Sequence, residues 1–186
     1  SLTVDDMLAI REEVIGAVAV SPEIRDRTQI LANGLNWNSQ ISGVDTNILE
    51  IRSWTIAEGA MFTDNDVRSG AKVCVIGNTV AQQLFAELDP IGQTLRLRNV
   101  PFKVVGVLGA KGFNYFGQDQ DDIVFIPYTS HLRHIARRQF LNSILIQAFS
   151  PEHMPRIQQD VADLLTQRRN GREPDFTVRN QLELAE

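Results

Sequence analysis

The spacing of apolar and polar residues along the chain predicts a mixture of helices and strands. Thr3 and Asp6 have the spacing of a capping box, which predicts a helix over Val4–Glu13. Strands are predicted where β-branched residues concentrate or alternate with polar ones: Val14–Val20, Ile24–Leu31, Gln40–Val44, Lys72–Ile76, Thr94–Arg98, Pro101–Leu108, Ile123–Ile126, Asn142–Phe149 and Asp175–Val178. Turns are predicted where two of these strands would be joined, at Asn33-Gly34 and Asn99.

Helix signals fall between these strands. Short helices are predicted after Asp45 and after Thr63, and Asn78 is expected to cap a longer one over Thr79–Glu87. Two more are predicted from Pro127 to about Arg138 and after Ser150-Pro151. The resulting order of helix, strands, a mixed middle, strand, helix and strand predicts an α+β fold in which one domain is interrupted by a second, smaller one.

Composition narrows the class of protein. The 186 residues are 43% hydrophobic and 22% charged, which is typical of a soluble globular protein, and the net charge of −5 argues against a nucleic-acid binder. The longest apolar run, Val14–Val20, is far shorter than the roughly 20 residues that span a bilayer, so we expect a soluble chain. The only cysteine, Cys74, excludes an internal disulfide and is expected to be a packed thiol.

The stretch GFNYFGQDQDDIVFIP, residues 112–127, is the strongest candidate for a functional site. Asp119, Asp121 and Asp122 follow a loop rich in glycine and aromatic residues. With His131 and His134, which are three residues apart, they define a metal-binding or hydrolytic module as one hypothesis.

The alternative is a structural turn whose carboxylates accept backbone N–H bonds, with both histidines exposed on a helix. The spacing favours this alternative, because a calcium loop that began at Asp119 would have Ile123 and Val124 where it needs an oxygen ligand and a glycine. The chain also has no Walker A sequence, no Gly-x-Ser-x-Gly elbow and no His-Glu-x-x-His pair. We therefore predict no catalytic, cofactor-binding or metal-binding residues.

Several segments together resemble the periplasmic core domain of MacB-like ABC transporter permeases, which are related to the FtsX and LolC proteins. Each segment is weakly specific, but their order and spacing cover nearly the whole chain. They are Ile51–Trp54, Phe62–Val67, Val75–Phe85, Pro90–Gln93, Pro101–Leu108, Gly117–Pro127 and Asp175–Asn180.

This resemblance implies a specific architecture and location. Residues 1–50 and 140–186 would form a porter-like α/β subdomain from both chain ends, and residues 51–139 an inserted, sabre-like α/β subdomain. The chain would be the periplasmic domain of an inner-membrane protein, between two of its transmembrane helices.

The resemblance also implies a function without catalysis. ATP hydrolysis in the cytoplasm would drive efflux through a periplasmic adaptor protein and an outer-membrane channel. The full transporter would be a homodimer, whereas the isolated domain is expected to be mainly monomeric. Phe113, Tyr115 and Phe116 are the predicted contact with the partner, with packing of these rings over the neighbouring hairpin as the alternative.

Overall fold

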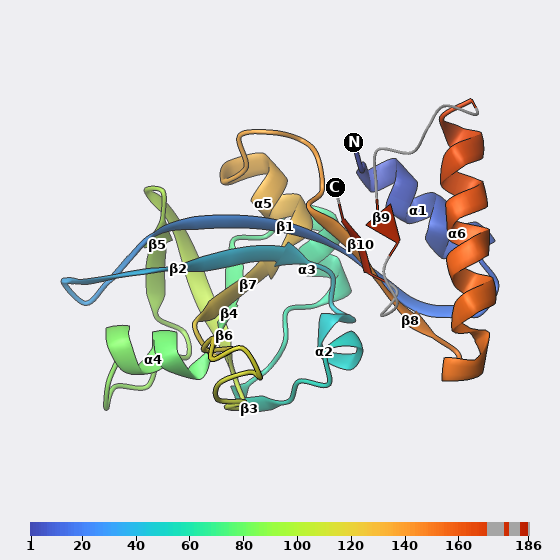
Figure 1. Cartoon of the computed structure of the whole chain (residues 1–186). Helices are drawn as coiled ribbons and strands as arrows, with labels where there is room; N and C mark the ends of the chain where they lie inside the picture. Colours follow the sequence, from blue (N-terminus) through green and yellow to red (C-terminus); the bar gives the residue numbers. More distant parts are fainter. Residues whose placement is uncertain (171–176, 179–182, 186) are drawn as a thin grey trace.

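A computed structural model describes residues 1–170, 177–178 and 183–185, and Figure 1 shows its mixture of helices and strands. The helices are α1 (Val4–Glu13), α2 (Ile48–Ile51), α3 (Asp64–Ser69), α4 (Asn78–Leu84), α5 (Tyr128–His134), the 3-10 turn η1 (Pro151–His153) and α6 (Met154–Arg168). The strands are β1 (Ala17–Ala32), β2 (Leu35–Val44), β3 (Ile56–Gly59), β4 (Val73–Ile76), β5 (Thr94–Leu97), β6 (Val100–Leu108), β7 (Ile123–Pro127), β8 (Ser143–Ala148), β9 (Thr177–Val178) and β10 (Glu183–Ala185).

The described strands form one sheet in the order β2-β7-β4-β6-β5-β1-β8-β10-β9, with β3 paired to β6. Figure 1 shows two lobes joined by β1: α1, α6 and β8 lie in one, and α4 with β4 to β7 lie in the other. Along β1, residues up to Glu23 pair with β8, and residues from Ile24 onward pair with β2. One strand therefore belongs to both lobes.

The long strand β1 corrects the prediction that Ser21-Pro22 separates two strands. Pro22 is paired opposite Ile144 of β8 inside the continuous strand. A proline is tolerated in a strand where its missing N–H is not needed for the ladder, and Pro22 lies next to the point where β1 changes partner. The short strand β3 was not predicted, and the predicted strand Asp175–Val178 lies partly outside the described residues.

Local capping signals are confirmed in two helices. Thr3 caps α1 and Thr63 caps α3, and each forms both bonds of a capping box. Asn78 is not a cap, because α4 begins at Asn78 itself and Gly77 holds the cap position. Ser150 precedes η1, but its hydroxyl lies 2.6 Å from the His153 ring instead of bonding a backbone N–H.

Three clusters of buried apolar side chains fill the structure. One joins the two chain ends and contains Met7, Ile144 and Ile157. A second packs Ile30 and Ile41 of the β1–β2 hairpin against the β-strands and helix of residues 74–135, and a third lies under α2 and α3. The hairpin thus shares its core with the middle of the chain.

This shared core leads to a test of the subdomain boundaries, which remain a prediction. A fragment of residues 51–139 lacks the β1–β2 hairpin, which pairs with β5 and β7. We expect a fragment of residues 24–139 to have the higher melting temperature, because it keeps that apolar contact. Thermal unfolding followed by circular dichroism measures the difference, and equal melting temperatures would place the hairpin with the chain ends instead.

Candidate functional site

The acidic run sits in the loop between β6 and β7 and is built into the fold by hydrogen bonds. The carboxylate of Asp121 accepts the backbone N–H groups of Lys111 (2.8 Å) and Gly112 (2.9 Å), and the residue is only 4% exposed. These bonds connect the end of the loop that precedes β7 to the end that follows β6.

The two neighbouring carboxylates are also occupied. Asp119 accepts the Thr79 hydroxyl at 2.6 Å and the backbone N–H of Asp121 at 3.0 Å. Asp122 accepts the indole N–H of Trp37 at 2.9 Å and the Ser39 hydroxyl at 2.6 Å. The run forms the structural turn that the spacing favoured, and it joins β2, α4 and the loop.

The histidines do not join these carboxylates in a metal site. Within the part of the chain that the structure describes, no three His, Cys, Asp or Glu side chains are grouped so that they could hold a metal ion. His131 is fully buried, which corrects the prediction that both histidines are exposed. It packs on Gly43 of β2, and its Nε2 lies 2.7 Å from the Asp26 carboxylate.

Replacing Asp121 tests its structural role against metal binding. We expect Asp121→Ala to lower the free energy of unfolding by about 2 kcal/mol, because two backbone N–H groups lose their acceptor. Calcium, zinc or a chelator should leave the melting temperature of the unmodified chain unchanged. Stoichiometric metal binding in calorimetry that disappears in Asp121→Ala would contradict this prediction.

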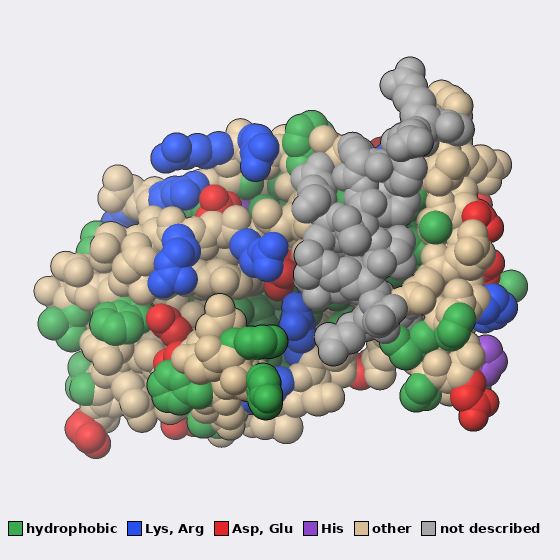
Figure 2. All heavy atoms as spheres, viewed as in Figure 1, with side chains coloured by type: hydrophobic (Ala, Val, Ile, Leu, Met, Phe, Trp, Pro, Cys, Tyr) green, Lys and Arg blue, Asp and Glu red, His purple; other side chains and the backbone are tan. Residues whose placement is uncertain are grey.

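The aromatic rings of the same loop point into solvent. Phe113 is 71% exposed, Tyr115 98% and Phe116 84%, so these rings do not pack over the hairpin. Figure 2 shows hydrophobic side chains at the surface where Figure 1 places this loop. The side-chain amide oxygen of Asn114 anchors the loop tip by accepting the backbone N–H groups of Phe116 and Gln118. The rings are thus held exposed on an ordered turn.

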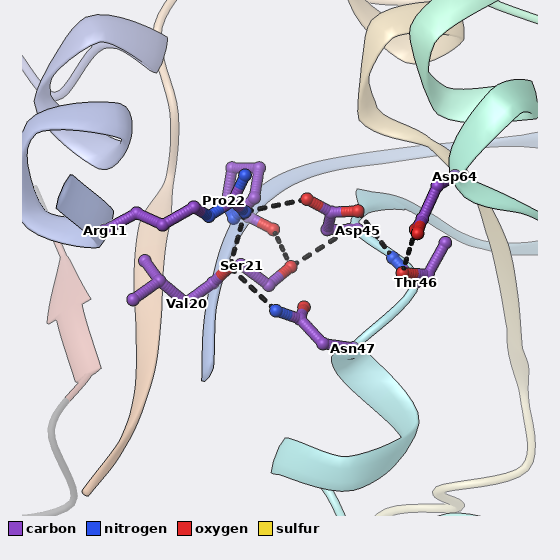
Figure 3. Close-up of polar contacts among 8 residues, drawn as sticks. All are labelled: Arg11, Val20, Ser21, Pro22, Asp45, Thr46, Asn47 and Asp64. Atoms are coloured by element: carbon purple, nitrogen blue, oxygen red, sulfur yellow. Dashed lines mark hydrogen bonds and ion pairs between the residues drawn. The ribbon is translucent and has the colours of Figure 1, made fainter. Parts of the chain in front are cut away.

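A second polar site lies where the two lobes meet (Figure 3). The guanidinium of Arg11, on α1, donates 2.7 Å hydrogen bonds to the Val20 carbonyl and to the Asp45 carboxylate just after β2. Asn47 donates to the same carbonyl at 3.0 Å, and the backbone N–H of Asp45 donates to the Ser21 hydroxyl. We call these residues the lobe junction.

The lobe junction continues to α3. Thr46 donates its hydroxyl to Asp64 in the first turn of α3 and its backbone N–H to Asp45, both at 2.7 Å. Arg11, Asp45, Thr46 and Asn47 line a surface depression, and Tyr128 lines it too. Burial, followed by the charge of Asp45, raises the pKa of the Tyr128 phenol. Helix α1 is therefore connected through side chains to both β2 and α3.

Comparison with known proteins decides the family. A model of the MacB-like periplasmic core domain matches residues 1–164. The chain belongs to this family. The MacB-like domain is 44% identical over 131 residues to the macrolide export ATP-binding/permease protein MacB of Syntrophobacter fumaroxidans, covering 70% of this chain and 18% of that protein. It is 37% identical to the protein of the same name from Rhodospirillum rubrum, covering 100% of this chain and 28% of that protein.

Solved structures confirm the α+β fold. The MacB-like domain superposes on the periplasmic region of MacB from Actinobacillus actinomycetemcomitans with a TM-score of 0.81 at 18% identity, covering 91% of this chain and 75% of that one. It superposes on the extracellular domain of the transporter YknZ from Gram-positive bacteria with a TM-score of 0.80 at 17% identity, covering 100% and 89%. No helix among the residues described in the MacB-like domain has the length and apolarity to cross a membrane.

Sequence reasoning did not find the lobe junction of this MacB-like domain. Arg11 and Asp45 are 34 positions apart, and neither belongs to a recognisable motif. The one available signal is Asp45 itself, a carboxylate directly after a strand of alternating pattern, and taken alone it indicates only the start of a helix.

Proposed function

We propose that the chain is the non-catalytic periplasmic domain of an ABC transporter permease, and that it couples ATP hydrolysis elsewhere in the transporter to extrusion through an adaptor protein. The family match and the names of the curated relatives support this proposal. The chain spans less than a third of the length of those relatives, which leaves room for an ATP-binding part and a transmembrane part.

A passive role agrees with the chemistry of the loop. Each of its three carboxylates accepts two hydrogen bonds from groups of the fold. Cys74 is buried in β4, and burial raises the pKa of its thiol, which disfavours the nucleophilic thiolate. These carboxylates and the thiol thus support the fold.

One observation supports a contact with the adaptor. Three large aromatic rings are exposed on a loop whose tip is held by hydrogen bonds to the Asn114 side chain. Rings on an ordered turn lose little conformational entropy on binding, and aromatic side chains are common anchors of protein interfaces. We infer that Phe113, Tyr115 and Phe116 contact the adaptor, which in turn would reach an outer-membrane channel.

Substituting the rings tests this contact. We expect Phe113→Ser with Tyr115→Ser to reduce adaptor binding and transport by the full transporter at least tenfold, since each buried aromatic anchor contributes about 1–2 kcal/mol. ATP hydrolysis and the melting temperature of the domain should stay within experimental error, because both rings are exposed.

The matched control for the rings is Phe149→Ser, which removes an equally exposed ring (70%) at the end of β8, in the other lobe. It should leave adaptor binding unchanged. A fall of several degrees in the melting temperature of the Phe113 and Tyr115 variant would show that these rings support the fold, and the contact would then be withdrawn.

The lobe junction supplies a mechanical path for this function. Movement of α1 acts on β2 through the Arg11–Asp45 ion pair and on α3 through Thr46. We infer that the junction transmits displacement of the chain ends to the lobe that carries the rings. We propose in addition that the full transporter is a homodimer and that this domain contacts the transmembrane helices of its own permease. The isolated domain should be mainly a monomer.

A further inference from the structure

A groove lined by four cations and three carboxylates lies beside the aromatic loop, by which we mean the residues between β6 and β7 that carry Phe113, Tyr115 and Phe116. It has a volume of about 610 Å³, and we call it the basic groove after the four side chains that line it: Arg25, Arg27, Arg52 and Lys111. They come from β1, from the segment after α2 and from the aromatic loop. Figure 2 shows Lys and Arg side chains gathered across the face that carries β1 and β2, although the chain as a whole has a net charge of −5.

The arginines of the basic groove are poorly neutralised. The shortest ion-pair distances of Arg25 and Arg52 are both 3.8 Å, and both run to Glu23. Arg27 donates from Nε to the amide oxygen of Asn38 at 3.0 Å. Elsewhere in the described residues, arginines approach carboxylates to between 2.7 and 3.4 Å, in the pairs Arg11–Asp45, Arg156–Asp160, Arg168–Asp6, Arg169–Asp6 and Arg98–Asp26.

Lys111 adds a cation that the fold holds close to Arg52. Its ammonium donates to the Arg52 carbonyl and lies 4.3 Å from the centre of the Trp54 ring. Burial and the charge of Arg52 lower the pKa of Lys111, with Asp121 opposing them. Holding like charges together costs free energy that an incoming anion would recover.

The rest of the lining suits a peptide better than a small ion. The lining also includes apolar side chains and side-chain amides, among them Ile51, Trp54, Ile123, Gln40, Asn114 and Gln118. Amides can bond a peptide backbone, and the apolar side chains can bury aliphatic ones. Three carboxylates also line the groove. Asp119 and Asp122 accept hydrogen bonds from the protein, and Glu23, which is 4% exposed, lies 3.8 Å from both Arg25 and Arg52.

Basic character extends past the groove along β1. Arg25 also lines an adjoining depression together with Arg137 and Arg138. On the opposite side the groove reaches Asn114 and Gln118, the residues that anchor the exposed rings. The groove therefore lies next to the turn that carries the rings and shares Arg25 with the adjoining depression.

We propose that the basic groove binds an acidic, partly apolar peptide segment of a protein partner. This proposal rests on the proposed function, because it assumes that the partner protein binds this face of the domain. It adds the chemistry of the partner segment: carboxylates that contact Arg25 and Arg52, and aliphatic side chains that contact Trp54. A compact anion would contact only the cations and would leave the apolar side chains of the lining uncovered.

Fluorescence anisotropy of the purified chain with a labelled twelve-residue peptide of glutamate, leucine and aspartate tests this proposal. The control peptide has glutamine and asparagine in place of the acids. We expect the acidic peptide to bind at least about tenfold more tightly than the control peptide, and the difference to shrink as salt is raised. In the double variant Arg25→Gln, Arg52→Gln, affinity for the acidic peptide should fall at least about tenfold.

Arg156→Gln is the matched control variant, because it removes an exposed arginine on α6 in the other lobe and should leave affinity unchanged. The melting temperature of each variant is measured as well, because Arg25 and Arg52 both face the buried carboxylate of Glu23. Affinities are compared at a temperature at which every variant is folded. The Phe113 and Tyr115 variant is measured in the same assay. Its result bears on the ring contact, whereas the arginine variants bear on the groove.

The proposal is overturned if the acidic peptide does not bind at about 1 mM, or if the double variant binds it as the parent chain does. It is also overturned if inorganic phosphate or vesicles of phosphatidylglycerol occupy the groove more tightly than the peptide, since the groove would then be a site for small anions or lipid.

Discussion

Gly77→Ala is expected to lower the free energy of unfolding by about 3 kcal/mol. A Cβ atom at this position would lie 2.1 Å from the carbonyl oxygen of Asp121 and 2.8 Å from its carbonyl carbon. The clash is with backbone, and the N–H of Gly77 donates to the Ile123 carbonyl at 2.8 Å, so neither segment can move without breaking a bond. The dihedral angles of Gly77, φ −73° and ψ 163°, suit any residue, and the cost therefore comes from the close approach alone.

Gly34→Ala separates this steric effect from the conformational one. Gly34 has φ +72°, and a Cβ atom added there would have nothing within 4 Å, so only the left-handed backbone is penalised, by about 1 kcal/mol. Denaturant unfolding of both variants gives the comparison. If Gly77→Ala costs no more than Gly34→Ala, the loop that follows Gly112 is free to shift, and its rings are not rigidly held.

Acidification should destabilise the domain through His131. Burial lowers the pKa of this imidazole below its usual 6.5, although the hydrogen bond and charge of Asp26 oppose the shift. As pH falls below 6.5, the unfolded chain takes up the proton first, so the free energy of unfolding decreases until the pKa of the folded state is reached. Each unit by which the folded-state pKa lies below the unfolded-state pKa corresponds to a loss of about 1.4 kcal/mol in the free energy of unfolding at low pH. In His131→Gln, stability should depend less on pH between about 7.5 and 5.5.

His134→Gln is the comparison, because His134 lies on the same helix but is partly exposed. Slight burial, followed by the charges of Lys72 and Arg133, lowers its pKa too, and because salt screens such exposed charges we expect its effect on the pH dependence to be smaller than that of His131→Gln at high salt. Removing the partner is the second arm of the experiment. Asp26→Ala leaves the buried Nε2–H of His131 without its acceptor and should cost about 2 kcal/mol at a pH of about 7.5. An unaltered pH dependence in His131→Gln would mean that the imidazole titrates normally in the folded state.

Local signals allowed much of the fold to be predicted, because the interactions that they encode span only a few residues. Thr3 with Asp6 and Thr63 with Asp66 are capping boxes in which both bonds form. Asn33-Gly34 has positive φ at both positions, as a two-residue hairpin turn requires.

Features that depend on distant contacts were not predictable in this way. The burial of His131 depends on Gly43, a residue of β2 that leaves room for the imidazole on the sheet. No pattern within the helix distinguishes His131 from His134. The continuity of β1 through Pro22 depends on the neighbouring strands. The spacing of the acidic run favoured a turn, but it did not reveal the donors, which come from residues as distant as Trp37.

The continuous strand β1 limits how the two lobes can move. Its 16 residues, at about 3.3 Å each, span roughly 50 Å without a flexible linker. We expect the strand to be least stiff where its hydrogen-bond partners change, next to Pro22. Close to that point the Val20 carbonyl accepts hydrogen bonds from both Arg11 and Asn47. Bending of the domain would therefore be concentrated at one point of one strand. Amide hydrogens beside Pro22 should exchange with solvent faster than those at either end of the paired region, and strain applied at α1 would be released there first.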